Sequence, residues 1–161
     1  MKHLFATWRM NYIEAPKHDG CFFCDYPLEE RDEERYILRR GNTCFVIMNV
    51  YPYNAGHLMV VPFRHTNVYE SLTDDEHLDM NHLLAQSIAV LKQTMGPEGF
   101  NIGMNLGKTA GAGVDDHLHM HVVPRWNGDN NFMPVLVDTR VVPEALDATY
   151  RKLSETWNTM F

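Results

Sequence analysis

The chain is poor in cysteine and in positive charge, and it has no long apolar run. Three cysteines in 161 residues are too few, and odd in number, for a disulfide framework, which favours a reduced, cytoplasmic protein. Lys and Arg number 14 against 21 Asp and Glu, a formal net charge of −7, so we expect no nucleic-acid partner. No window approaches the ~20 apolar residues of a membrane span. The first twenty residues also lack the apolar core of a secretory leader.

Length and patterning predict one domain over residues 1–161, because a 45% hydrophobic share can fill a single core. Apolar alternation predicts five strands, at 36–40, 43–48, 57–61, 100–106 and 117–123. Thr73 and Glu76 form a capping box for a long helix that ends at Gly96. A last helix is expected to begin near Pro143 and to bury a stripe of Leu146, Tyr150, Leu153 and Trp157. This order of elements predicts an α+β domain with an antiparallel sheet.

Three histidines alternate with apolar residues in HLHMHVV at 117–123. Alternate side chains of a strand share one face, so His117, His119 and His121 should lie together while the residues between them enter the core. Each imidazole brings two ring nitrogens that need partners, and packing does not explain a row of them at ~7 Å intervals. The row therefore indicates a metal site, a catalytic site or both.

Imidazole can attack phosphorus and leave again, which suits covalent nucleotidyl transfer. The glycine-rich segment GKTAGAG at 107–113 ends just before the histidine row, and backbone N–H groups of such a loop can approach phosphates. It has neither Walker spacing nor a following helix, so the loop alone is a weak indication. Its candidate phosphate-binding residues are Gly107, Lys108, Gly111, Ala112 and Gly113.

A second candidate site is the CFFC segment from Cys21 to Cys24. A redox pair should open a helix at the end of a strand, and nothing before this segment resembles a strand, so zinc is favoured. A structural zinc takes four N or S ligands in a tetrahedron. Cys44 belongs to a core strand, so the two missing ligands are expected to be His65 and His117. Zinc would then also fix the segment that presents the histidine row.

HLHMHVV resembles the H-φ-H-φ-H-φ-φ signature of the histidine triad (HIT) family, where φ is apolar. The likeness extends to Asn49 with the loop before His57, to PFRH and to CFFC, and covers about residues 21–124. It implies an HIT-like antiparallel sheet of five or slightly more strands, with one long central helix and a C-terminal helix. Residues 1–20 would be an arm that packs onto this core, and 125–161 an extension carrying the last helix. The family also implies a homodimer that acts on the α-phosphate of nucleotides.

The resemblance assigns roles residue by residue. His119, the middle histidine, would be the nucleophile, His121 would hydrogen-bond the phosphate, and His57 would support them from the neighbouring strand. Asn49 would hold the ribose and Asn105 would reach the phosphates. The zinc-carrying branch of the family would have its structural zinc on the two cysteines and two histidines named above.

NVYPYNAGHLMVVPFRH, NLGKTAGAG and HLHMHVVPRWNGDNNF resemble more narrowly a bacterial branch that phosphorolyses diadenosine tetraphosphate. Many family members carry Gly-Gln-Ser/Thr before the histidine row, where this chain has Gly111-Ala112-Gly113-Val114. The missing amide leaves a small backbone-lined pocket for inorganic phosphate. We therefore expect phosphorolysis to ADP and ATP, with Lys108 or Arg125 as charge partners of the leaving phosphates.

Three alternatives stay open. A nucleotide hydrolase would use the same histidines and pass the nucleotidyl group to water. A nucleotide-binding module without turnover would leave the middle histidine unused. A thiol redox protein built on CFFC would need no histidine row at all.

Overall fold

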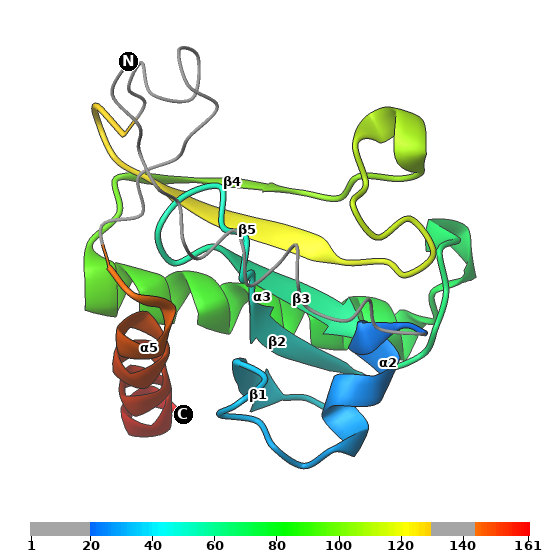
Figure 1. Ribbon diagram of the computed structural model, residues 1–161, viewed down its shortest axis with the longest axis horizontal. Helices are drawn as coiled ribbons and strands as arrows, with labels where there is room; N and C mark the ends of the chain where they lie inside the picture. The colour runs from blue at the N-terminus through cyan, green and yellow to red at the C-terminus, as the bar shows by residue number, and fades with distance from the viewer. Residues whose placement is uncertain (1–19, 130–143) are drawn as a thin grey trace, which may run out of the picture.

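A computed structural model describes residues 20–129 and 144–161 of the chain (Figure 1). Five strands form one sheet in the order β1-β2-β3-β5-β4, and every neighbouring pair is antiparallel. The strands are β1 (Ile37–Arg40), β2 (Cys44–Met48), β3 (Leu58–Pro62), β4 (Gly99–Gly103) and β5 (Met120–Arg125). The α-helices are α2 (Phe22–Asp25), α3 (Asp74–Met95) and α5 (Leu146–Met160). Short 3-10 turns are η1 (Tyr26–Leu28), η2 (Tyr69–Ser71) and η3 (Lys108–Ala110).

The predicted α+β class, with an antiparallel five-stranded sheet, one long helix and a C-terminal helix, is confirmed. Figure 1 shows α3 running along the sheet, with α5 near one side of the view and α2 near the other. The predicted packing of the N-terminal arm falls on residues 1–19, which lie outside the described residues. The last helix, predicted to begin near Pro143, begins three residues later as α5, at Leu146. No helix within the described ranges is long and apolar enough to cross a membrane.

The two faces of the sheet bury separate apolar clusters. Alternate residues of β2 and β3, such as Val46 and Leu58, pack with α3 and α5, and the Trp157 side chain is fully buried there. The residues between them, such as Ile47 and Met59, pack on the other face with Phe23 of α2. Both β2 and β3 are therefore buried along their whole length. Their sequences are for this reason continuous apolar runs and do not alternate between apolar and polar residues.

The long helix is fixed at both ends and also holds the first hairpin. Thr73 and Glu76 form the predicted capping box, and Gly96 ends α3 in the left-handed conformation with φ of 58°. In the second turn of α3, the Asp79 carboxylate accepts the backbone N–H groups of Thr43 (2.7 Å) and Cys44 (2.9 Å). The turn between β1 and β2 is thereby tied to the helix.

The strand predicted at 117–123 begins later, and this boundary was wrong. β5 starts at Met120, where its pairing with β3 stops: Val60 and Met120 are the last paired residues, although β3 itself runs on to Pro62. Upstream of Met120 the backbone N–H of Leu118 donates instead to the Thr66 carbonyl, at 2.7 Å. The chain keeps its alternation there, because Leu118 is buried in the core on the helix side.

One close approach sets the position of the loop before β3. Gly56 has φ of +72°, and a Cβ atom there would lie 2.6 Å from the Met95 sulfur and 3.1 Å from Leu91 Cδ2. Only glycine satisfies both the backbone conformation and the lack of space. The loop that precedes His57 therefore rests directly on the last turns of α3.

Candidate active site and metal centre

The histidines lie on the face of the sheet opposite to α3. His121 is paired with Met59 across β3 and β5, so it shares the face of Met59 and Phe23. The His119 ring lies 4.8 Å from the His121 ring, and the His57 ring lies 5.0 Å from it on the other side. All three side chains are buried. The structure thus brings together the three residues predicted to be catalytic.

Hydrogen bonds fix which nitrogen of each ring carries the hydrogen. The Tyr53 backbone N–H donates to His57 Nδ1 at 3.0 Å, so the hydrogen of neutral His57 is on Nε2. His57 Nε2 lies 2.9 Å from His121 Nδ1 and donates to it. His121 must then carry its own hydrogen on Nε2, which is buried and has no hydrogen-bond partner among the described residues. A buried donor without a partner is ready to bind an anionic oxygen.

His119 has the opposite arrangement. Its Nδ1 lies 2.9 Å from the His117 carbonyl oxygen, and a carbonyl can only accept, so Nδ1 carries the hydrogen. The Nε2 lone pair of neutral His119 is therefore available for attack. The site pairs a bare nitrogen on His119 with an N–H donor on His121, which suits attack on a phosphorus atom whose oxygens need a donor.

Burial keeps the rings of His119 and His121 uncharged near neutral pH. Burial lowers the pKa of His119 and, together with the neighbouring His119 ring, lowers the pKa of His121 to about 4. Desolvation disfavours the charged imidazolium in each case. A neutral His119 is the form that can act as a nucleophile.

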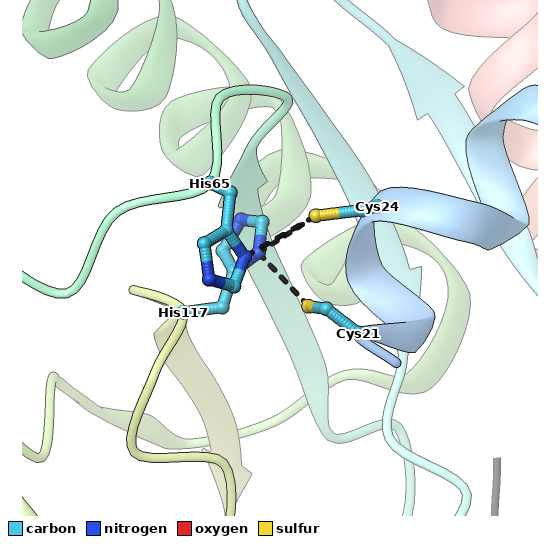
Figure 2. A group of neighbouring side chains, drawn as sticks. All are labelled: Cys21, Cys24, His65 and His117. Carbon is cyan, nitrogen blue, oxygen red and sulfur yellow. Dashed lines mark hydrogen bonds between the residues drawn. The ribbon is translucent and has the colours of Figure 1, made fainter. Parts of the chain in front are cut away.

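A second cluster lies at the start of the histidine row. Figure 2 shows Cys21 and Cys24 of the α2 segment facing His65 and His117. The ligand atoms of all four residues lie within 4.8 Å of one another, and His117 is the most buried. The predicted metal ligands are therefore brought together, from three separate parts of the chain.

The distances in this cluster fit a tetrahedral zinc ion. Cys21 Sγ lies 3.2 Å from His117 Nδ1, and Cys24 Sγ lies 3.3 Å from His65 Nδ1. Zn–S and Zn–N bonds of about 2.3 and 2.0 Å put S and N roughly 3.5 Å apart in a tetrahedron. His117 Nε2 donates to the Pro62 carbonyl at 2.9 Å, which leaves Nδ1 unprotonated and directed at the thiols.

The Cys24 thiol requires a cation to ionise at neutral pH. Burial and the neighbouring Cys21 raise the pKa of Cys24 to about 11, so this thiol is protonated at neutral pH. A metal ion would displace the proton, as coordinating thiols generally lose theirs. Four protein ligands would leave such an ion no open position.

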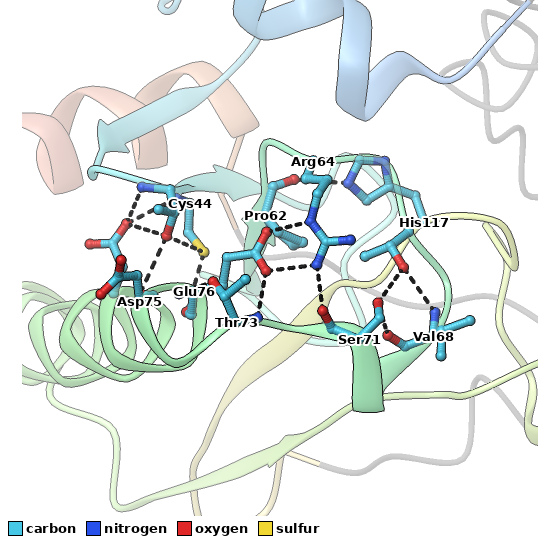
Figure 3. Close-up of polar contacts among 12 residues, drawn as sticks. Cys44, Pro62, Arg64, Val68, Ser71, Thr73, Asp75, Glu76 and His117 are labelled. Atoms are coloured by element: carbon cyan, nitrogen blue, oxygen red, sulfur yellow. Dashed lines mark hydrogen bonds and ion pairs between the residues drawn. The ribbon is translucent and has the colours of Figure 1, made fainter.

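An ion pair between an exposed guanidinium and a buried carboxylate holds the loop that carries His65 (Figure 3). The Arg64 guanidinium donates to the Glu76 carboxylate at 2.7 and 2.8 Å and to the Ser71 carbonyl at 2.8 Å. Glu76 also closes the capping box with Thr73, and Arg64 holds the pKa of its carboxyl at about 2. The start of α3 and the metal cluster thus share one set of polar contacts.

Among the other residues predicted to bind nucleotide, Asn49 contacts a histidine of the site. Asn49 accepts the Tyr51 backbone N–H at 2.8 Å, and its Nδ2 lies 3.4 Å from His57 Nδ1. Asn105 is half-buried in the segment after β4. The side chain of Lys108 is exposed and lies 3.5 Å from Asp115.

The glycine-rich loop forms a closed turn. The N–H groups of Gly111 and Ala112 donate to the carbonyls of Lys108 and Gly107. Gly107 and Gly111 have φ of 81° and 90°, and open space surrounds Gly113 as well. Arg125 is paired with Asp129 at 2.6 Å, so both predicted charge partners of the phosphates lie beside a carboxylate.

Comparison with known proteins agrees with this geometry. The model of the HIT domain family matches residues 30–128. The chain belongs to the HIT family. A Mycobacterium tuberculosis protein named AP-4-A phosphorylase is 41% identical over 166 residues, which cover 98% of this chain and 85% of that protein. A Schizosaccharomyces pombe adenosine 5′-monophosphoramidase is 25% identical over 84% of this chain and 96% of its own length.

Among solved structures, a zinc-bound histidine triad protein from Mycobacterium smegmatis superposes with a TM-score of 0.70. It is 24% identical and the match covers 88% of this chain and 95% of the other. At this identity the likeness shows that the two HIT proteins share a fold.

Several contacts of this HIT site were missed from the sequence. The Tyr53 N–H that orients His57, the Arg64–Glu76 pair and the Asp129 carboxylate that binds Arg125 all depend on how loops fold. The spacing of four residues between Arg125 and Asp129 is a pairing signal only on a helix, and these two residues lie at the end of β5 and in the turn after it.

Proposed function

We propose that this HIT protein phosphorolyses diadenosine tetraphosphate to ADP and ATP through a nucleotidyl-histidine on His119. The observation that supports it most directly is the opposite hydrogen placement on His119 and His121. The similarity to AP-4-A phosphorylase over nearly the whole chain supports the choice of substrate.

In the first half-reaction, the Nε2 lone pair of His119 attacks the α-phosphorus of one adenosine. A P–N bond forms, the bond to the bridging oxygen breaks, and ATP leaves. The His121 Nε2–H donates to a non-bridging oxygen as its charge grows. His57 donates to His121 throughout and so keeps that donor in place.

In the second half-reaction, orthophosphate attacks the adenylyl group, the P–N bond breaks, and ADP leaves with His119 restored. Water is at ~55 M, so phosphate at millimolar levels wins only where it is bound and aligned, and effective molarities of ~10⁵ M or more are available to such a group. The space around Gly107, Gly111 and Gly113 is open, and we propose that this loop binds the second anion.

Cys21, Cys24, His65 and His117 would hold a structural zinc ion. Bound there, the ion supplies no reaction step and fixes the segment that leads into His119. The zinc-bound M. smegmatis neighbour and the tetrahedral distances support this assignment.

The test is product analysis with diadenosine tetraphosphate, with and without inorganic phosphate. ADP plus ATP formed only with phosphate supports the proposal, and AMP plus ATP at the same rate in phosphate-free buffer contradicts it. His119→Ala should form no acid-labile adenylyl-protein, and a label that persists on this variant would place the nucleophile elsewhere.

A hydrolase is the second candidate. The same histidines could pass the nucleotidyl group to water, and the S. pombe monophosphoramidase supports this reading. Phosphate-independent release of AMP is the result that would favour it.

A further inference from the structure

The short helix α2 contacts the metal cluster and the candidate nucleophile with neighbouring residues. Cys21 and Cys24 face His65 and His117 (Figure 2). Phe23, which lies between the two cysteines, points into the sheet face and is 1% exposed. Its ring centroid lies 5.4 Å from that of His117 and 5.3 Å from that of His119.

These contacts hold the plane of the His119 ring. The hydrogen bond from Nδ1 to the His117 carbonyl fixes one ring nitrogen. Phe23 lies against the ring at an interplanar angle of 40°, and His121 meets it edge-on at 81°. Rotation of the ring about its own bond would therefore require Phe23 or His121 to move.

The position of Phe23 depends in turn on α2. A helix of four residues has almost no stability of its own, because nucleation of a helix is costly. Its attachments are the two cysteines and the apolar packing of Phe23 against Phe45, Ile47 and Met59. If the two cysteines were no longer held in the cluster, only the packing of Phe23 would keep α2 in place.

We propose that Phe23 is a positioning residue that couples the occupancy of the metal cluster to the orientation of the His119 ring. The inference rests on the proposed roles of His119 and of the Cys/His cluster. A zinc ion in the cluster would then affect the orientation of His119 in addition to the stability of the fold. Thiol modification or chelation would slow adenylyl transfer in protein that remains folded.

The experiment uses the full chain labelled with ¹⁵N-histidine, at one fixed pH. Ring nitrogen shifts report how much of His119 carries its hydrogen on Nδ1, with and without chelator. Wild type is compared with Phe23→Leu and with Phe100→Leu. Phe100 of β4 packs against the apolar cluster on the opposite, helix-covered face of the sheet, so its substitution removes the same volume away from Phe23 and His119.

We expect zinc-loaded wild type and zinc-loaded Phe100→Leu to hold one His119 tautomer. Chelated wild type and Phe23→Leu, with or without metal, should show a mixture. Adenylyl-protein formation should slow about ten- to a hundredfold in the same samples, as expected when a reacting group is misplaced by about 1 Å. Circular dichroism confirms that each sample is folded.

The proposal is overturned if chelation leaves the His119 signal unchanged in folded wild type, or if Phe100→Leu broadens it as much as Phe23→Leu does. It is also overturned if chelation slows adduct formation equally in wild type and Phe23→Leu. The tautomer signal needs no turnover, so a failure of the proposed phosphorylase activity would be seen separately, as wild-type protein that forms no adduct.

Discussion

His57 Nε2 lies 2.9 Å from His121 Nδ1, and the backbone N–H of Tyr53 decides the direction of that hydrogen bond. A main-chain group of an irregular loop thus determines which nitrogen of His121 carries a hydrogen. The arrangement needs no charged partner, which suits a site where burial disfavours imidazolium.

The first prediction concerns His57. His57→Ala removes the donor to His121, whose hydrogen can then move to Nδ1 and leave no donor for the phosphate. We expect kcat to fall by about tenfold or more while KM changes little, because the lost contact acts mainly as charge develops. Steady-state kinetics at pH 7 check this, and a rise in KM with unchanged kcat would contradict it.

The second prediction concerns pH and His121. Its pKa is about 4 in the folded protein and 6.5 ordinarily, so between these values the unfolded chain binds the extra proton. Stability should therefore fall as pH drops from about 6.5 to about 4, by up to about 3 kcal/mol from this residue. Urea unfolding of wild type and His121→Gln measures it.

The free energy of unfolding of His121→Gln should rise relative to that of wild type as the buffer becomes more acidic. The metal ligands are common to both, so their own loss at low pH cancels. A difference that stays constant from pH 7 to pH 4.5 would rule out the lowered pKa.

The third prediction concerns the metal. Elemental analysis of protein purified without chelator should give one zinc per chain, and Cys24→Ser should lose it. With free zinc at a hundred times its Kd, the ion should add about 2.7 kcal/mol to the free energy of unfolding. Cys44→Ala is the control: this thiol is buried in the core, so its loss should lower stability and leave the zinc content unchanged.

The fourth prediction compares two arginines. Arg64→Gln leaves the buried Glu76 carboxylate without its partner and frees the loop that carries His65, so it should lower stability and weaken zinc binding severalfold. Arg31→Gln removes an exposed pair with Glu34 and should change neither, since exposed ion pairs contribute little.

The effect of Arg64→Gln also has a defined pH range. The pKa of Glu76 is about 2 against an ordinary 4.5, so the contribution of the pair is present above pH 4.5 and is lost as pH falls towards 2. The two stability curves should converge over that interval. Equal zinc affinities for the two arginine variants would show that the pair does not support the metal cluster.

The sequence predicted most of the candidate site because strand alternation and ligand chemistry are local rules. His117, His119 and His121 share a face although only His121 lies in a strand, since Leu118 keeps the chain extended by entering the core. The metal ligands followed from the number of donors that zinc needs and from Cys44 being buried.

What the sequence did not predict depends on how separate segments meet. Nothing in CFFC indicates that Phe23 reaches His119, because that contact requires α2 to lie across β2 and β3. The late start of β5 likewise follows from where its pairing with β3 stops, at Val60 and Met120. Both are properties of the packed sheet and of no single segment.

Gly56 packs against the last turns of α3. The packing of α3 on one face of the sheet therefore affects the position of the loop before His57, which belongs to the site on the other face. Met95 lies on the side of the sheet away from the histidines, yet its sulfur limits how deeply the loop before His57 can settle. A bulkier residue at position 95 would lift that loop and draw the Tyr53 N–H away from His57. Variation in the packing of a distant helix can therefore tune the proton placement of this site without altering any of its histidines.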